Sequence, residues 1–415
     1  MVCLHACRLL VAAVLLGLAA QPATAAPLRT IALTDDIAPA EDPDLFFAPA
    51  PRGAQFASFD SATINTSGQV AFRARLGGSG FSSANNVAIV GPTGIVARTG
   101  TPHATAESEL DRDEFTALDA PVLSDTGTIA FVGTGRDPVL GEDIRRGIAT
   151  VGTARGSVFE RDGAPGTGGA RFLSFGEPPL DAPSISGSGD VAFRAFLTGG
   201  DTTLATNRGI FTLPEGGPTA LLLRSGSPVP GAGGAVYTDF RDPSINNAGE
   251  VAFRGTVSGG GEVVATSSSV IARTGEAAPG TGGAEFSGFS RPILNNAGEV
   301  AFRGALTGNG VTGANDQGLF TSSGGFVREG DAAPGTGGAV FAGFGAPSLN
   351  DLGEILFGAG LTGPGVTAAN DFALFFWDGI RAPSLFLREG GGVGSRWRRS
   401  ADDQQPADHL RRSEQ

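Results

Sequence analysis

The stretch INNAGEVAF, residues 245–253, recurs six times along the chain in closely related forms. The copies are INTSGQVAF (64–72), LSDTGTIAF (123–131), ISGSGDVAF (185–193), INNAGEVAF (245–253), LNNAGEVAF (294–302) and LNDLGEILF (349–357). Their glycines lie 49 to 62 residues apart. Repeats of this period are typical of propellers and solenoids, in which each copy is one supersecondary unit.

Each copy reads as a β-hairpin. Val251 and Phe253 alternate with other residues, so they share one face of a strand that leaves the turn. An Asn at the first turn position can hydrogen-bond its own backbone, and a Gly at the last position supplies the positive φ of a type I turn with a bulge. We therefore assign a structural turn role to Asn65, Gly68, Gly127, Gly189, Asn246, Gly249, Asn295, Gly298, Asn350 and Gly353.

Two more strands are expected in each repeat. Residues 318–320 follow a loop rich in Gly and Asn, and a Ser-Gly-Gly turn leads from them to residues 326–328. A second signature, Arg-x-Gly, ends each copy, at Arg98, Arg161, Arg224, Arg273, Arg328 and Arg388. Four strands per repeat predict an all-β fold, a β-propeller of about six four-stranded blades. Seven blades remain an alternative, because residues 30–33 resemble a stray fourth strand, and so does a β-solenoid.

The N-terminus has the pattern of a secretory signal. Arg8 precedes an apolar run of 12 residues, 9–20, and Ala23-Thr24-Ala25 offers small residues for cleavage after Ala25. The run is shorter than the roughly 20 residues that span a bilayer. We expect a signal peptide at 1–25, a propeller at 26–391 and a disordered tail at 392–415. The mature protein is then secreted or periplasmic, with no membrane span and no recognisable C-terminal sorting signal.

The composition excludes several functions. All 29 basic residues are Arg, so a Walker loop or a Schiff-base lysine is absent. Residues 26–391 contain 38 Asp and Glu against 23 Arg, a net charge of −15, which opposes nucleic acid binding. The three His are scattered at His5, His103 and His409, and both cysteines, Cys3 and Cys7, lie in the leader. Classical triads and disulfides are therefore not expected.

The only cofactor that the sequence suggests is calcium. Asn246 with Glu250, Asn295 with Glu299, and Asn350 with Glu354 place oxygen atoms around repeated turns, as hard cations prefer. The competing interpretation is that Asn serves the turn and Glu pairs with a following Arg. No complete D-x-D-x-D-G loop occurs in the sequence, so the structural interpretation is preferred.

A functional site should break the repeat. Arginines that recur after the motif phenylalanine, such as Arg73, Arg254 and Arg303, are expected to pair neighbouring repeats. The departures from symmetry are the insert 136–146, the loop 107–114 and the aromatic run 375–377. We assign no catalytic residue. The alternative is a propeller enzyme, a glycan hydrolase or lyase, with carboxylates at one mouth of the channel.

With Ala-Phe after the turn glycine, the six motifs resemble the bacterial exported tandem-repeat family of NxxGxxAF type. The resemblance covers nearly all of residues 30–390 and implies an exported surface protein, while no shared biochemical activity is attached to that family. We therefore expect a monomeric, non-enzymatic binding or structural scaffold of the cell envelope or exterior. Its partner would be a protein or a glycan.

Overall fold

The computed structural model describes residues 32–39, 53–100, 114–136, 144–152, 156–175 and 182–390. The expected leader, the tail and His103 lie outside these ranges. The chain separates into a short unit, Met1–Leu33, and a unit that contains Thr34–Gln415 and all the sheets. Among the described residues no helix occurs, and so none is long and apolar enough to cross a membrane.

Six antiparallel sheets follow one another in chain order. Sheet 1 contains β1 (Gln55–Ile64), β2 (Val70–Gly77), β3 (Val87–Gly91) and β4 (Gly94–Arg98). Sheet 2 contains β5 (Glu114–Leu118), β6 (Val122–Leu123), β7 (Ile129–Arg136), β8 (Ile144–Val151) and β9 (Gly156–Phe159). Sheet 3 contains β10 (Arg171–Ser174), β11 (Ser184–Ile185), β12 (Val191–Thr198), β13 (Arg208–Leu213) and β14 (Ala220–Arg224). Sheet 4 contains β15 (Tyr237–Ile245), β16 (Val251–Val257), β17 (Glu262–Thr266) and β18 (Val270–Arg273). Sheet 5 contains β19 (Glu285–Phe289), β20 (Ile293–Leu294), β21 (Val300–Thr307), β22 (Gln317–Thr321) and β23 (Gly324–Arg328). Sheet 6 contains β24 (Val340–Phe344), β25 (Ser348–Leu349), β26 (Ile355–Thr362), β27 (Phe372–Trp377) and β28 (Ser384–Arg388).

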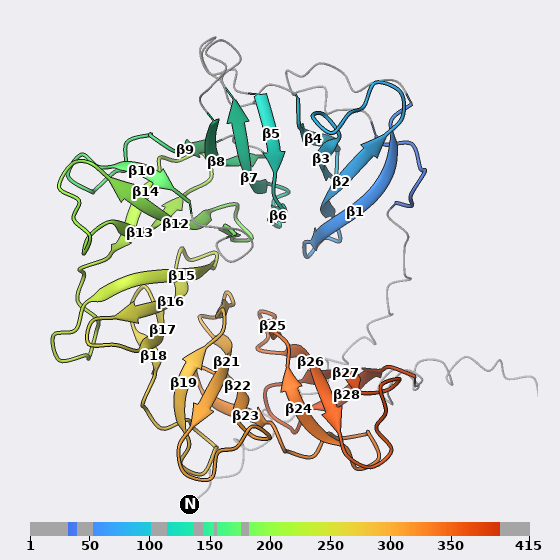
Figure 1. Cartoon of the computed structure of the whole chain (residues 1–415), viewed down its shortest axis with the longest axis vertical. Coiled ribbons are helices and arrows are strands. Elements are labelled where there is room, and N and C mark those ends of the chain that lie inside the picture. The colour runs from blue at the N-terminus through green and yellow to red at the C-terminus, as the bar shows by residue number, and fades with distance from the viewer. Residues whose placement is uncertain are drawn as a thin grey trace, which may run out of the picture. The chain divides into compact units, whose positions relative to one another are not determined.

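Each sheet is a meander of four strand positions, and its register fits the predicted hairpins. In sheets 2, 3, 5 and 6 the first strand is interrupted, and both of its pieces pair with the second strand. The predicted third and fourth strands at 318–320 and 326–328 lie within β22 and β23. The all-β propeller prediction is confirmed, and Figure 1 shows the sheets in succession around a common centre.

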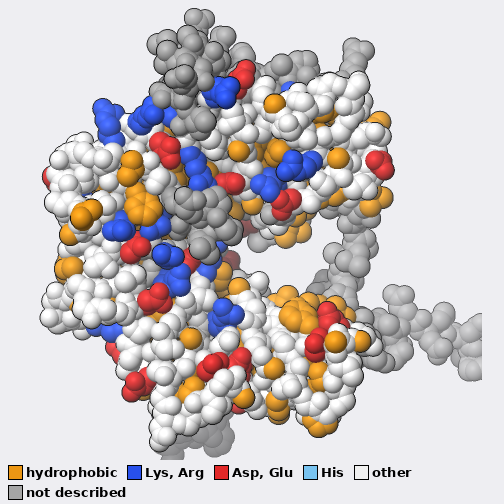
Figure 2. Space-filling view, viewed as in Figure 1, with side chains coloured by type: hydrophobic (Ala, Val, Ile, Leu, Met, Phe, Trp, Pro, Cys, Tyr) orange, Lys and Arg blue, Asp and Glu red, His pale blue; other side chains and the backbone are white. Residues whose placement is uncertain are grey.

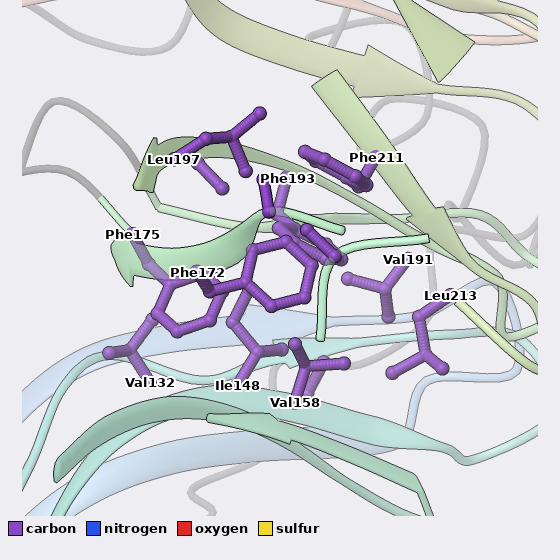
Figure 3. Packing of buried hydrophobic residues seen from close by; sticks show 14 residues of the cluster. Val132, Ile148, Val158, Phe172, Phe175, Val191, Phe193, Leu197, Phe211 and Leu213 are labelled. Carbon is purple, nitrogen blue, oxygen red and sulfur yellow. The ribbon is translucent and has the colours of Figure 1, made fainter. Parts of the chain in front are cut away.

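The hydrophobic core is divided among the interfaces between consecutive sheets. Five buried clusters join sheet 1 to 2, 2 to 3, 3 to 4, 4 to 5 and 5 to 6. Figure 3 shows the second of these, where Val132, Ile148 and Val158 of sheet 2 meet Phe172 and Phe193 of sheet 3. Phenylalanine rings of one sheet therefore pack against aliphatic side chains of the previous sheet and stabilise the interface between them.

Sheets 1 and 6 are the two ends of the series. Of the described residues, none joins these two sheets in a buried apolar cluster. Leu387 in β28 is 40% exposed, whereas Val327, its counterpart in β23, is 8% exposed. Ile64 is likewise 68% exposed, against 5% for Ile245. Both end faces thus keep apolar side chains in solvent.

One sequence alignment is wrong by two residues. The amide of Gly330 donates to the oxygen of Phe341 over 2.9 Å, and in the second repeat the same bond runs from Arg161 to Phe172 over 2.8 Å. Arg161 therefore occupies the glycine position, with a φ of +75°. The predicted Arg161-x-Gly163 signature is really Phe159-Glu160-Arg161. The expected strand at 30–33 lies partly outside the described residues, and Ala32 and Leu33 are not in a strand.

Candidate functional site

Each of the six motifs forms a tight reversal between the first and second strand positions. The amide of Gly249 donates to the main-chain oxygen of Asn246 over 3.0 Å, and Asn246 Oδ1 accepts the amide of Glu250 over 3.0 Å. Gly249 has a φ of +75°, and the other five motif glycines have φ between +77° and +99°. Residues that carry a side chain rarely adopt this left-handed backbone conformation, which explains why the position is glycine.

The turns are also bonded to one another, in what we call the turn ladder. Asn246 Nδ2 donates to the main-chain oxygen of Asn295 over 3.2 Å, and Asn295 Nδ2 donates to that of Asn350 over 2.9 Å. The same bond joins Asn65 to Ser124 over 3.0 Å. The motif Asn therefore holds consecutive sheets together in addition to shaping its own turn.

Five of the six calcium candidates accept a hydrogen bond at a side-chain oxygen in this ladder or beside it. Asn246 Oδ1 accepts two amides, Glu250 Oε1 accepts Ser268 Oγ over 3.0 Å, and Glu354 Oε2 accepts Asn350 Nδ2 over 2.9 Å. Glu299 reaches toward the next turn, where a Cβ on Gly353 would lie 2.8 Å from Glu299 Oε2. In the described ranges no group of three or more His, Cys, Asp and Glu side chains could hold a metal ion.

The arginines that follow the motif phenylalanine pair neighbouring sheets, as expected. Nη1 of Arg73 donates to the oxygen of Leu118 over 3.0 Å, and Nη1 of Arg254 donates to that of Phe289 over 2.9 Å. Arg303 makes the equivalent bond to Phe344 over 2.5 Å. Their recurrence is thus a property of the scaffold.

Sheets 3 to 5 carry a set of charged residues in which two repeated arginines, Arg194 and Arg254, are joined by charges that depart from the repeat, such as Asp242 and Arg291. We name it the arginine cluster; it consists of Arg194, Arg208, Arg241, Arg254 and Arg291 together with Asp239, Asp242 and Glu262. In Figure 2, which has the view of Figure 1, Arg side chains gather toward the inner side of the green and yellow sheets. Five positive and three negative charges leave a local excess of two positive charges in a chain of net charge −13.

The first half of the cluster lies between sheets 3 and 4 and is centred on Asp239. Its Oδ1 lies 2.8 Å from Arg194 Nη2 and 3.4 Å from Arg208 Nε, and its Oδ2 lies 4.0 Å from Arg241 Nε. The guanidinium groups of Arg194 and Arg208 also lie 4.3 Å and 5.5 Å from the ring centre of Phe196. One carboxylate is thus shared among three cations.

The second half lies between sheets 4 and 5 and is centred on Asp242. Asp242 Oδ2 lies 3.2 Å from Arg254 Nη2, and Arg254 Nη1 lies 3.9 Å from Glu262 Oε1. Burial lowers the pKa of Arg291, while the charge of Asp242 acts to raise it. Asp242 has a φ of +54°, a strained backbone for a residue other than glycine.

A cavity of about 390 Å³ adjoins the second half, lined by Glu262, Ser287, Ser290, Arg303, Asp316 and Gln317 among others. Glu329 lies close to Asp316 and is only 5% exposed. Burial, followed by a hydrogen bond to Asp316 and the charge of that residue, raises the pKa of Glu329 to about 7. Glu262 is the residue that joins the cavity to the arginine cluster.

Of the three departures from the repeat that the sequence predicts, only the aromatic run 375–377 is described in full. Residues 137–143 and 107–113 are outside the described ranges. Phe375 is buried in the core, and Trp377 stacks on Phe326 with ring centres 4.2 Å apart. The sequence signal that was missed is the residue directly before a proline that recurs in the repeats. This residue is Ala120 in sheet 2 and Ala346 in sheet 6, but it is Asp242 in sheet 4 and Arg291 in sheet 5.

The fold and the site together define a β-propeller whose repeated residues hold its sheets and whose charged cluster departs from the repeat. The chain belongs to a family of unknown function (DUF7453), whose model matches residues 28–269 and 262–393. No curated protein matches the chain in sequence.

The comparison with solved structures finds similar chains at low sequence identity. The Dos1 propeller is 10% identical, with a TM-score of 0.33, over 81% of this chain and 85% of that one. The Trypanosoma rangeli sialidase in complex with the inhibitor DANA is 11% identical, with a TM-score of 0.30, over 81% of this chain and 53% of that one. The Hadza microbial sialidase Hz136 is 11% identical, with a TM-score of 0.29, over 77% and 67%.

Proposed function

We propose that this protein is an exported bacterial propeller of the NxxGxxAF type that binds a partner at the cell envelope or outside the cell and does not transform it. One observation carries the proposal: the repeated side chains bond the sheets to one another, and in the arginine cluster two of the repeated arginines are joined by charges that depart from the repeat, such as Arg241, Asp242 and Arg291. The leader pattern at 1–25 supports export.

The chemistry of the described residues favours binding over catalysis. They include no His and no Cys, the side chains that most often act as general base or as nucleophile. Guanidinium groups remain protonated at neutral pH, so they hold anions well and exchange protons poorly. A cluster of this kind can retain a ligand by charge and geometry without activating a water molecule.

To test this proposal, the full chain is expressed in a bacterial host, and its location and its N-terminus are determined. We expect export, an N-terminus at Ala26 in the mature protein, and sedimentation with isolated cell envelopes. Incubation with the envelopes should release no new soluble glycan or peptide, as judged by mass spectrometry. Retention in the cytoplasm, absence of envelope binding, or steady release of products would contradict the proposal.

A second candidate function, hydrolysis by a carboxyl pair, rests on Asp316 and Glu329. The raised pKa of Glu329 suits a general acid, and Asp316 lines the cavity. However, Glu329 is buried and does not line the cavity, so a substrate would reach Asp316 first. Envelope turnover that disappears in E329Q would favour this enzyme over a binding protein.

A further inference from the structure

Two arginines of the cluster face each other across a strand pair. Arg241 in β15 is directly opposite Arg254 in β16 in the register of sheet 4. Like charges at such opposed positions destabilise a sheet unless something neutralises them. The side chain of Arg241 is 45% exposed and that of Arg254 is 20% exposed, so the pair can be reached from solvent.

The carboxylates of the cluster neutralise this pair incompletely. Asp239 is 4.0 Å from Arg241, and it lies closer to Arg194 and Arg208. Asp242 is 3.2 Å from Arg254 and also faces Arg291. Arg241 is therefore the most exposed and the least neutralised of the cations in these ion pairs.

Buried donors of the cluster also lack acceptors. Nε of Arg254 and Nε of Arg291 are shielded from solvent, and neither has a hydrogen-bond partner in the described part of the chain. Buried donors are normally paired, and an unpaired one costs stability. These buried nitrogens are out of reach of a ligand, and an anion that approached this surface would meet the exposed guanidinium group of Arg241.

We infer that the arginine cluster binds a short acidic segment of a protein partner, through two or three carboxylates; this rests on the binding function proposed above. The planar guanidinium group matches a carboxylate with two parallel hydrogen bonds. A segment with few charges engages the local excess of two positive charges, whereas a long polyanion meets the negative charge of the whole chain.

The aromatic residues favour a protein segment over an acidic glycan. Tyr237 and Trp377 are the only Tyr and Trp among the described residues. Tyr237 is 2% exposed, and Trp377 is stacked on Phe326. Tyr237 therefore offers no open face to a sugar ring, and one face of Trp377 is covered by Phe326.

The probe is a fluorescent peptide with the sequence Gly-Glu-Glu-Gly-Glu, and its affinity is measured by anisotropy with the full chain. We expect Arg241→Glu to weaken binding at least tenfold and Arg75→Glu, an exposed arginine in β2, to leave it unchanged. Added salt should weaken wild-type binding. Arg241→Gln, with an intact thermal transition, should show an intermediate loss.

Equal affinity of Arg241→Glu and Arg75→Glu would overturn the inference, and so would tighter binding of oligogalacturonate or of a phosphorylated peptide. The proposed function is tested separately by export and envelope binding. If wild type and Arg241→Glu sediment equally with envelopes, binding at the envelope stands and the assignment to this cluster fails.

Discussion

Asn246 and Asn295 occupy consecutive turns, and Nδ2 of Asn246 donates to the main-chain oxygen of Asn295 over 3.2 Å. Both side chains are 4% exposed, so this bond is shielded from water. A turn alone needs only the side-chain oxygen of its Asn. The nitrogen bonds the next sheet, and the motif thereby joins local shape to the assembly of the propeller.

Removal of the Asn295 side chain tests the turn ladder. We expect Asn295→Ala to lower the free energy of unfolding by about 2–3 kcal/mol, because buried amides lose their acceptor and the bond to Asn350 is lost. Asn295→Ser is the matched control, since Ser124 caps its own turn with a hydroxyl. It should cost about 1 kcal/mol. Ser keeps the turn acceptor and removes only the bond to Asn350, so wild-type stability of Asn295→Ser in urea denaturation would argue against a bond between turns.

Asp242 should be the most costly charge to remove. Asp242→Asn leaves Arg254 and Arg291 without their carboxylate in a buried site, and we expect a loss of about 3 kcal/mol. Asp201→Asn is the control: Asp201 is 62% exposed and lies 2.9 Å from Arg224, so its loss should stay below about 1 kcal/mol. A small effect of Asp242→Asn in chemical denaturation would mean that the cluster is solvated.

Glu329 should make stability depend on pH. Its pKa is raised from 4.5 to about 7 in the folded chain, so between these values the folded state keeps a proton that the unfolded state releases. The free energy of unfolding then falls as pH rises through this window, by at most about 3 kcal/mol, and levels off above it. Subtracting the pH profile of Glu329→Gln from that of wild type should isolate this fall. A flat difference would show that Glu329 titrates normally.

The end faces should tolerate polar substitution. Leu387→Asp in sheet 6 is expected to cost less than about 1 kcal/mol, because Leu387 is 40% exposed. Val327→Asp at the same place in sheet 5 should cost more than about 3 kcal/mol, because it puts a carboxylate into a buried cluster. Comparable thermal destabilisation by both variants would reveal that sheet 6 is covered by another surface.

The turns could be predicted because their causes are local. Asn246 and Gly249 are three residues apart, and the hydrogen bonds that need them lie within the same five residues. The alternating strand pattern of Val251 and Phe253 is local in the same way, and it led to the correct fold class. Arg161 misled the alignment because a non-glycine residue adopts the left-handed conformation there.

The ladder and the arginine cluster could not be predicted, because they depend on how repeats are placed in space. Arg254 and Arg291 are 37 residues apart in sequence, and only the packing of sheet 4 against sheet 5 brings both to Asp242. An alignment of the repeats on their proline shows the charged substitutions, but it does not show that they converge. The spacing of the repeats along the sequence therefore predicts the scaffold but does not predict the arginine cluster.

The central claim is that repeated residues hold the scaffold while the asymmetric cluster binds the partner. The most direct measurement compares Arg73→Gln with Arg241→Gln for both unfolding free energy and affinity for the acidic peptide. Arg73→Gln should lose about 1–2 kcal/mol of stability and keep the wild-type affinity, because Arg73 bonds sheet 1 to Leu118. Arg241→Gln should keep its stability and lose affinity. A loss of affinity in Arg73→Gln, or wild-type affinity in Arg241→Gln, would contradict the account.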